Sequence, residues 1–412
     1  MFLFRRFVLG RPINILIFIN FMFFGLLFLM VGPYEGSIPI AGFLLTLLMV
    51  ICYSLIVKLD MGDQYIFLII SILTSIGVAM LYRLNPVYGF RQITWFGIAA
   101  VLYFMAYFLF RWFKYWDKGL YVYIACSFLL FIITFTFGTT IKGATNWIRI
   151  GSFNFQPAEA IKLFFIFTLA SYFKRTERLK NTYVFLAIVY IHIILLTLQR
   201  DMGMAMLFFG VFISVYYIYQ TEVKLFLYNI AAALTIGVFS YYTMNHVRVR
   251  FDTWLNPWKD IAGRGYQITQ SLFAIAAGGF FGSGLGLGSP DYIPEVHTDF
   301  IFSAICEELG IFGGIAVVLL YFIMIYRGFK ITMMINEPFK KIVALGITLT
   351  YSYQTFIIIG GVIKLIPLTG VTLPFVSYGG SSLISAFVAF GILQALSKKS
   401  LEGEEYIEIE QQ

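Results

Sequence analysis

The residues best suited to acid–base chemistry lie close together between Ile293 and Phe300. Asp299 stands immediately before a long apolar run, and Glu295 and His297 precede it at alternate positions. A carboxylate at the edge of a low-dielectric region has a raised pKa and can act as a general base. His297 is the rival base, and Glu295 is a secondary candidate. Asp299 could instead cap the free N–H groups of the helix that follows.

A second group of polar residues could bind an anion. Arg248 and Arg250 belong to the long polar segment that precedes Asp299, and arginine side chains bind phosphate oxygens bidentately. A solvated loop, or one that contacts lipid headgroups, is the alternative. Arg200 could form a local ion pair with the adjacent aspartate or contribute to an exposed polar site. The candidate diphosphate-binding set is Arg248, Arg250, Arg200, Asp201 and Lys364.

Glu159 and Lys162 are three residues apart in a predicted helix, so their side chains share a face and can form an ion pair. Inside a bilayer such a pair costs far less than either charge alone. The pair could be purely structural, or it could shape a substrate cavity. Ser377 and Ser381 are further secondary candidates. They belong to a glycine- and proline-containing segment that we interpret as a broken or re-entrant stretch ending at a helix N-terminus.

Six glycines are concentrated between Gly278 and Gly288, and they match no nucleotide-binding loop. They could provide a flexible loop, a gating element or a close approach of the backbone to a ligand. Glu307 and Glu308 follow one or two turns into the next apolar run. At least one of these two carboxylates is expected to face protein or water rather than lipid.

The composition of the chain predicts that these residues belong to a membrane protein. The chain has 412 residues, of which 60% are hydrophobic and 12% charged, and its mean hydropathy is +0.85. Such a composition predicts an all-α polytopic membrane protein, since each span needs about 20 apolar residues. We predict about twelve transmembrane helices, at Ile13–Met30, Ile38–Val57, Tyr65–Tyr82, Ile93–Phe110, Leu120–Phe137, Ala158–Phe173, Tyr183–Leu198, Met202–Tyr219, Leu225–Tyr242, Phe300–Tyr326, Ile342–Ile363 and Ser382–Leu396.

The basic residues predict the orientation. The net charge of +8 indicates basic cytoplasmic loops rather than a nucleic-acid partner. Most lysines and arginines fall on one side of the predicted spans, for example in the short loop between Lys174 and Lys180. By the positive-inside rule both termini are cytoplasmic, and the loops that hold Asp299, Arg200 and Lys364 lie outside. The three cysteines fall in apolar runs, so no disulfide is expected.

With these motifs in sequence order, the chain resembles the SEDS family (shape, elongation, division and sporulation) of cell-wall polymerases. The resemblance extends over roughly residues 140–396, and the first 110 residues match more weakly. It is carried by Gly143–Ile148, Phe155–Lys162, Leu198–Gly203, Gly265–Gln267, Pro294–Phe302, Glu307–Gly310 and Leu373–Ser382.

The resemblance implies a peptidoglycan glycosyltransferase that acts on lipid II in the bacterial cytoplasmic membrane, alongside a class B penicillin-binding transpeptidase. By family match Asp299 is the catalytic acidic residue, and Glu159 and Lys162 form a buried pair in a central cavity. The usual family core has ten spans, so residues 1–118 would hold two extra spans, and residues 119–412 the core with an outer catalytic loop at 244–299. The chain also departs from the pattern at Arg200, commonly proline, and at Asn146, commonly basic.

The expected reaction begins when Asp299 takes a proton from the 4-hydroxyl of the acceptor sugar. That oxygen attacks the anomeric carbon of the donor, which inverts to a β-1,4 link and releases undecaprenyl diphosphate. Arg248, Arg250 or a divalent cation such as Mg²⁺ or Mn²⁺ could stabilise the leaving charge. A lipid II flippase, or a membrane scaffold for a transpeptidase, is the alternative. The sequence does not distinguish a role in cell elongation from one in division or sporulation.

Overall fold

The computed structural model describes residues 2–31, 37–141, 144–151, 153–174, 182–219 and 223–410. The side chains of residues 2–11 and 399–410, which include Arg5, Arg6 and Arg11, are outside that description. Several residues that entered the motif and orientation arguments also lie outside the described residues, namely Lys142, Gly143, Arg175, Arg178 and Lys180.

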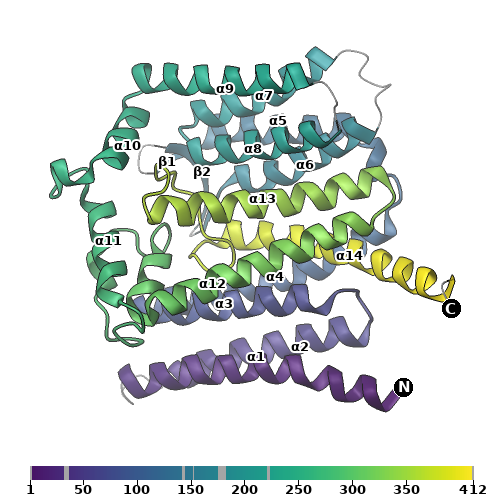
Figure 1. The fold of residues 1–412 in the computed structure, drawn as a ribbon, viewed down its shortest axis with the longest axis vertical. Helices are drawn as coiled ribbons and strands as arrows, with labels where there is room; N and C mark the ends of the chain where they lie inside the picture. The colour runs from purple at the N-terminus through teal and green to yellow at the C-terminus, as the bar shows by residue number, and fades with distance from the viewer. Residues whose placement is uncertain are drawn as a thin grey trace. The chain divides into compact units, whose positions relative to one another are not determined.

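Helices account for most of the described chain (Figure 1). The protein has the all-α polytopic membrane fold that its composition predicts. The long helices are α1 (Phe2–Val31), α2 (Ser37–Lys58), α3 (Gln64–Leu84), α4 (Pro86–Trp112), α5 (Leu120–Phe137), α6 (Pro157–Lys174), α7 (Thr182–Leu198), α8 (Met202–Tyr219), α9 (Val223–Thr243), α12 (Ile301–Met334), α13 (Pro338–Val362) and α14 (Gly380–Glu410). Between them lie the shorter α10 (Asn245–Leu255) and α11 (Tyr266–Gly278), and the 3₁₀ turns η1 (Trp116–Lys118), η2 (Pro257–Asp260) and η3 (Pro290–Tyr292).

Each of the twelve predicted spans coincides with one of the long helices. Among the described residues, ten helices are long and apolar enough to cross a membrane. The two others are α6 and α7. Helix α7 has 17 residues, and α6 carries Glu159, Lys162 and Lys174. The buried charge of α6 requires protein neighbours rather than lipid, whereas α7 is apolar but short.

A small sheet was not predicted from the sequence. Strands β1 (Thr139–Ile141), β2 (Ala144–Ile150) and β3 (Phe153–Phe155) pair antiparallel in the order β1-β2-β3. The sequence analysis treated these residues as a polar loop, because the strands are three to seven residues long and lack a continuous apolar face. The sheet places Asn146 and, just beyond β3, Gln156 near the start of α6.

The chain folds into two compact units. The first unit contains Met1–Trp112, Ser271–Met334 and Thr372–Gln412, and the second contains Phe113–Gln270 and Ile335–Val371. Each unit is therefore built from segments far apart in the sequence. The predicted division at residue 118 between extra spans and family core stays a prediction.

In the first unit, α4 packs along α14, and α3 packs against α1, α4 and α12. Helices α1 and α2 run side by side next to α3 (Figure 1). Nearly all of α3 is buried, which explains its continuous run of apolar residues. Asp63 caps this helix by accepting from the amide of Tyr65, and Arg327 donates to both Asp63 oxygens at 2.7 Å.

In the second unit, α6 lies against α5, α8 and α13. Aromatic side chains fill much of this core, for example the rings of Tyr172 and Phe185, whose centroids are 3.6 Å apart. This packing encloses the face of α6 that carries Glu159 and Lys162, both of which are at most 3% exposed.

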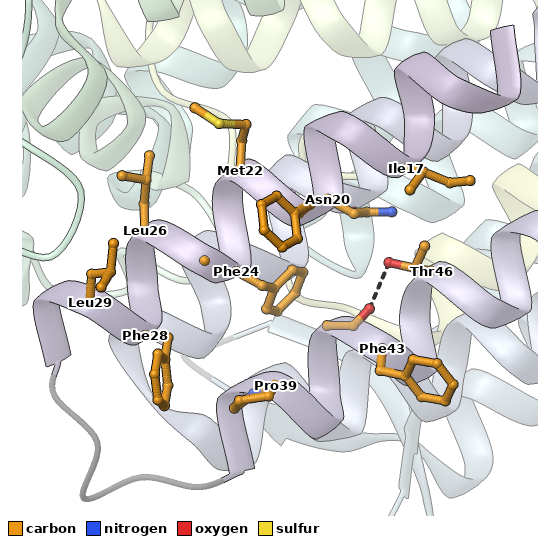
Figure 2. Close-up of a pocket in the computed structure, with 13 residues that line it drawn as sticks. Ile17, Asn20, Met22, Phe24, Leu26, Phe28, Leu29, Pro39, Phe43 and Thr46 are labelled. Carbon is orange, nitrogen blue, oxygen red and sulfur yellow. Dashed lines mark hydrogen bonds between the residues drawn. The ribbon is translucent and has the colours of Figure 1, made fainter. Parts of the chain in front are cut away.

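An apolar pocket of about 600 Å³ lies between α1 and α2 (Figure 2). Phenylalanines such as Phe24 and Phe43 line it, and Asn20 is one of its few polar residues. None of the candidate site residues lines this pocket. Both helices are among those long and apolar enough to span a membrane.

Candidate active site

Asp299 lies in an irregular turn that leads into α12. It is half-buried, and its amide donates to the carbonyl of Glu295 at 3.2 Å. The carbonyl of Phe300 accepts from Ser303 and Ala304, so the N-cap position belongs to Phe300. The capping alternative placed Asp299 at the N-cap of the helix. Because α12 begins at Ile301, Asp299 instead lies one residue before the N-cap.

The backbone before Asp299 bends at Glu295, whose φ of +59° lies in the left-handed region. Such a conformation is costly for a residue with a Cβ and persists only when its surroundings impose it. Glu295 and His297 lie near each other, with 3.9 Å between His297 Nε2 and Glu295 Oε2. The imidazole of His297 stacks on the ring of Tyr88, with centroids 4.7 Å apart. These contacts give both secondary candidates a place in the same turn as Asp299.

A second irregular segment, between Thr372 and Gly379, holds this turn. Ser377 Oγ donates to the carbonyl of Thr298 at 2.5 Å, and the amide of Tyr378 donates to the carbonyl of His297 at 2.8 Å. Both acceptors immediately precede Asp299, so the segment fixes the backbone that carries the carboxylate. Ser377 is thus part of the support of Asp299. Ser381 is buried in the first turn of α14.

Two residues of α4 join this arrangement, and the sequence analysis missed both. Gln92 is fully buried, and its Nε2 donates to the carbonyl of Ser377 at 3.1 Å. Tyr88, one turn earlier, contacts His297 and Tyr378 through its ring. The predicted span began at Ile93, so both residues were counted in a loop. The signal that could have found them is their spacing of four, which places them on one helix face.

Helix α12 is broken at Gly310, which has φ +71° and ψ −178°. The break frees backbone groups, and the glycine-dense segment pairs with them. The amide of Ile311 donates to the carbonyl of Gly279, and the carbonyl of Glu307 accepts from the amide of Ser283, both at 2.9 Å. The next residue in each of the two segments forms the corresponding hydrogen bond. Non-helical backbone at membrane depth persists where protein covers it, and this exchange supplies that cover.

The glycines of residues 278–288 serve this close approach. A Cβ at Gly278 would overlap the carbonyl of Cys306, and one at Gly282 would overlap the carbonyl of Glu308. At these two positions the glycine is needed because the backbone packs against another part of the same chain. The alternatives of a flexible loop, a gating element or a ligand contact stay predictions for the tract as a whole.

The side chains of Glu307 and Glu308 are buried, as the sequence predicted for at least one of them. Glu307 Oε1 accepts from the amide of Ser289, and Glu308 Oε2 accepts from the amide of Gly286. Arg83 at the end of α3 forms an ion pair with Glu308. The guanidinium of Arg83 also donates to the carbonyl of Gly288 at 2.6 Å and to Asp291 at 3.2 Å. Arg83, which the sequence analysis did not single out, thus ties α3 to the segment that precedes Asp299.

The remaining candidates belong to the second unit. Asp201 lies between α7 and α8, and its Oδ2 accepts from Asn146 Nδ2 and from Gln156 Nε2, both at 2.8 Å. Burial raises the pKa of Asp201 above its ordinary value of 3.8, while the hydrogen bonds from Asn146, Met204 and Gln156 oppose the shift. Asp201 therefore joins Asn146 of β2 and Gln156, which follows β3, to the start of α8. The expected ion pair between Asp201 and Arg200 stays a prediction.

The predicted ion pair between Glu159 and Lys162 forms, with 2.7 Å between Nζ and Oε2. Lys162 Nζ also donates to Gln354 at 3.2 Å and lies 4.9 Å from the ring centroid of Tyr351. Both contacts come from α13, so the pair joins α6 to α13.

The basic candidates of the second unit point to different partners. Arg250 donates to the carbonyl of Thr369 at 2.7 Å, whereas Arg248 is exposed and lies 3.7 Å from Asp252. Lys364 has a φ of +62°, and its Nζ lies 3.4 Å from the carbonyl of Leu255. Arg248, Arg250 and Lys364 thus contact different partners, and their shared role in binding a diphosphate stays a prediction.

Arg200 and Arg250 do lie near a common residue, His246. Burial and then the charges of these two arginines lower the pKa of His246 below its ordinary value of 6.5. The positive charge that acts on this imidazole comes from the two arginines. The sequence analysis did not single out His246.

Metal binding has little support from the protein side chains alone. In the ranges that the structure describes, no group of three or more His, Cys, Asp or Glu residues could hold a metal ion. Magnesium is commonly bound by one or two carboxylates together with substrate phosphates. The expectation of Mg²⁺ or Mn²⁺ therefore stays a prediction, with Asp299 as the carboxylate nearest the proposed chemistry.

Comparison with known proteins gives clear relatives. The family model FtsW/RodA/SpoVE, described as "Cell cycle protein", matches residues 63–402. The peptidoglycan glycosyltransferase RodA of Mycobacterium tuberculosis is 37% identical over 272 residues, which cover 62% of this chain and 58% of the relative. Stage V sporulation protein E of Bacillus subtilis is 34% identical over 82% of this chain and 97% of its own length. The chain thus matches less than two thirds of the length of the mycobacterial relative.

Solved structures of other proteins also resemble this fold. One, described as "Structural coordination of polymerization and crosslinking by a peptidoglycan synthase complex", matches with a TM-score of 0.70 and 26% identity, and covers 82% of this chain and 98% of its own. The rod shape determining protein RodA of Thermus thermophilus matches with a TM-score of 0.63 and 23% identity over 82% of this chain and 97% of its own. At that identity the second match shows the shared fold.

Proposed function

The chain belongs to the FtsW, RodA and SpoVE family of cell cycle proteins, and we propose that it is a peptidoglycan glycosyltransferase that polymerises lipid II. The names of its relatives support this activity, since RodA and FtsW proteins are called peptidoglycan glycosyltransferases. The observation that carries the proposal within this chain is the support of Asp299. Two hydrogen bonds fix the carbonyls immediately ahead of it.

The Asp299 carboxylate accepts the proton of the acceptor 4-hydroxyl as that oxygen attacks the donor anomeric carbon. The new bond forms on the face opposite the diphosphate, so the product is a β-1,4 link. Undecaprenyl diphosphate leaves with the electron pair of the broken bond. A positioned general base contributes about 10²–10⁴-fold to such a rate, and holding it rigidly preserves the alignment that proximity effects need.

The leaving diphosphate needs positive charge. Arg200 and Arg250 of the second unit are candidates for this charge, because both lie close enough to His246 to lower its pKa. Arg248 and Lys364 stay in the proposed set, although Arg248 is exposed beside Asp252. A divalent cation, when bound, would neutralise phosphate charge in the same way.

The proposed setting is the bacterial cytoplasmic membrane, with both termini inside and residues 244–299 outside. The basic residues of the loops support this orientation. We also propose a class B penicillin-binding transpeptidase as the partner. The related structure that couples polymerisation with crosslinking supports it. The remaining partners are the membrane lipids.

A polymerisation assay on the purified protein with lipid II tests the proposal. We expect glycan strands on a gel from the wild type and from Asp291→Asn, because Asp291 is 68% exposed. Asp299→Asn should reduce polymerisation by at least about 10²-fold, the lower part of the range for general base catalysis, while membrane insertion is unchanged.

Two results would contradict the assignment. If Asp299→Asn polymerised lipid II at the wild-type rate, Asp299 would not be the general base. Movement of lipid II across vesicle membranes by the wild type, without any polymer in the presence of the partner, would instead favour the flippase.

A further inference from the structure

The turn that carries Asp299 has no regular secondary structure to hold it. Its place depends on the carbonyls of His297 and Thr298, which accept from Tyr378 and Ser377. The donor segment is irregular as well, and Phe375 within it has a left-handed φ of +67°. Two helices hold other parts of this segment, since Tyr321 of α12 donates to the carbonyl of Pro374, and the hydroxyls of Thr372 and of Ser382 in α14 are hydrogen-bonded at 2.8 Å. The connection nearest the two donors comes from a third helix.

Gln92 of α4 provides that connection. Its side-chain amide bonds the backbone on both sides of Tyr378: Nε2 donates to the carbonyl of Ser377 at 3.1 Å, and Oε1 accepts from the amide of Gly379 at 3.5 Å. Gln92 is fully buried, so water does not compete for these bonds. Helix α4 in turn packs along α14, which begins directly after this segment, at Gly380.

Tyr88 strengthens the same connection from one turn earlier. Its ring lies 4.7 Å from the ring of His297 and 4.9 Å from that of Tyr378, between centroids. One face of α4 therefore contacts both irregular segments. All of these residues belong to the first unit.

We propose that Gln92 is a positioning residue for Asp299, which acts through the segment of Ser377 and Gly379. The inference rests on the proposed function, because the position of Asp299 affects the rate only if Asp299 is the base. Gln92 is remote from Asp299 in the sequence, and its two hydrogen bonds go to the backbone of the supporting segment rather than to Asp299. Its loss should therefore lower kcat and leave the KM for lipid II unchanged.

Gln92→Leu tests the proposal, with Gln394→Leu as the matched control. Gln394 is also fully buried in the first unit, donates to the carbonyl of Met61 at 3.0 Å and accepts from Tyr103 at 2.9 Å. Both variants remove one donor and one acceptor from the same core, so their thermal midpoints should fall similarly. A misplacement of about 1 Å can cost about 10²-fold in rate. We expect Gln92→Leu to lose 10- to 100-fold in kcat, with KM within about twofold, and Gln394→Leu to retain its kcat.

A double-mutant comparison separates this role from simple destabilisation. If Gln92 acts through Ser377, the kcat of Gln92→Leu combined with Ser377→Ala will be close to that of the more impaired single variant. If Gln92→Leu does not fold, Tyr88→Leu is measured instead. That change lies at a half-buried position and removes the ring contacts with the same segments. The same loss of kcat at constant KM is expected for it.

Three results would overturn the inference: equal loss of kcat in the Gln92 and Gln394 variants, a change in KM alone, or full additivity with Ser377→Ala. The parallel assay of Asp299→Asn keeps the two proposals apart. If Asp299→Asn is inactive while Gln92→Leu is normal, only the positioning role fails. If Asp299→Asn polymerises normally, the proposed function itself fails.

Discussion

A carboxylate can act as a base only when it is held where the transferred proton will be. Asp299 is placed by the backbone around it, through the hydrogen bonds that Thr298 and His297 receive from Ser377 and Tyr378. In the second unit, buried carboxylates are likewise held by specific partners. The carboxylate of Asp201 is surrounded by amide donors, and that of Glu159 is paired with Lys162. The backbone around Asp299 and the carboxylate of Asp201 are thus held by partners that are remote in the sequence, whereas Glu159 is held by a neighbour on its own helix.

The pair of Glu159 and Lys162 gives a prediction at this scale. Breaking a buried ion pair leaves an uncompensated charge and costs about 3–5 kcal/mol, whereas replacing both members costs far less. We expect Glu159→Gln and Lys162→Met each to lower the free energy of unfolding by about 3 kcal/mol or more. The double variant should be more stable than either single variant, as measured by thermal unfolding in detergent. A double variant that is less stable than both would show that each charge has other essential partners.

At the scale of elements, the break in α12 explains why a glycine-dense segment precedes Asp299. Gly310 interrupts the helix, and residues 279–284 pair with the backbone groups that the break releases. Arg83 and the two buried glutamates then hold the next residues of this segment. The polar connection between α11 and α12 is therefore anchored along its length, which is what a loop with a catalytic residue at its end requires.

Gly310→Ala tests this account. The φ of +71° strains any residue with a Cβ, and that Cβ would overlap the carbonyl of Phe280. Left-handed backbone alone costs roughly 1–2 kcal/mol, and the overlap adds to it. We expect a lower thermal midpoint and a loss of polymerisation. Gly97→Ala in α4 is the control, since a Cβ there meets no atom within 4 Å. If both variants behave alike, close packing at Gly310 is not important.

At the scale of the whole molecule, the first two helices lie outside the part of the chain that the family model matches. The family match begins at residue 63, and α1 and α2 precede it. These two helices enclose the apolar pocket of Figure 2 and pack on α3. The predicted site residues all lie within the matched range, so α1 and α2 carry none of them.

The proposed orientation predicts which positions reagents reach from outside the cell. Tyr292, between α11 and α12, is 69% exposed, and Lys58 at the end of α2 is exposed as well. In intact cells stripped of their outer layers, we expect Tyr292→Cys to react with a membrane-impermeant maleimide. Lys58→Cys should react only after permeabilisation, and a cysteine-free parent provides the background. The opposite pattern would place Asp299 inside and exclude lipid II polymerisation at the outer face.

Much of this protein could be predicted from local sequence. Twelve apolar segments of suitable length predicted the twelve long helices, because burial in hydrocarbon depends on composition over about 20 residues. The pair of Glu159 and Lys162 was predicted because a spacing of three is fixed by helix geometry. Asp299 was identified by its motif and by its place before an apolar run. Its role stays a prediction.

Other features depended on tertiary structure. Gln92, Tyr88 and Arg83 gain their significance only when α3 and α4 meet segments some 200 to 290 residues later in the chain. The short strands near Asn146 and the break at Gly310 are likewise stabilised by distant partners rather than by their own pattern. The sequence by itself determined what crosses the membrane and which carboxylate is a candidate base. Long-range hydrogen bonds, which no local periodicity encodes, decided how that carboxylate is held.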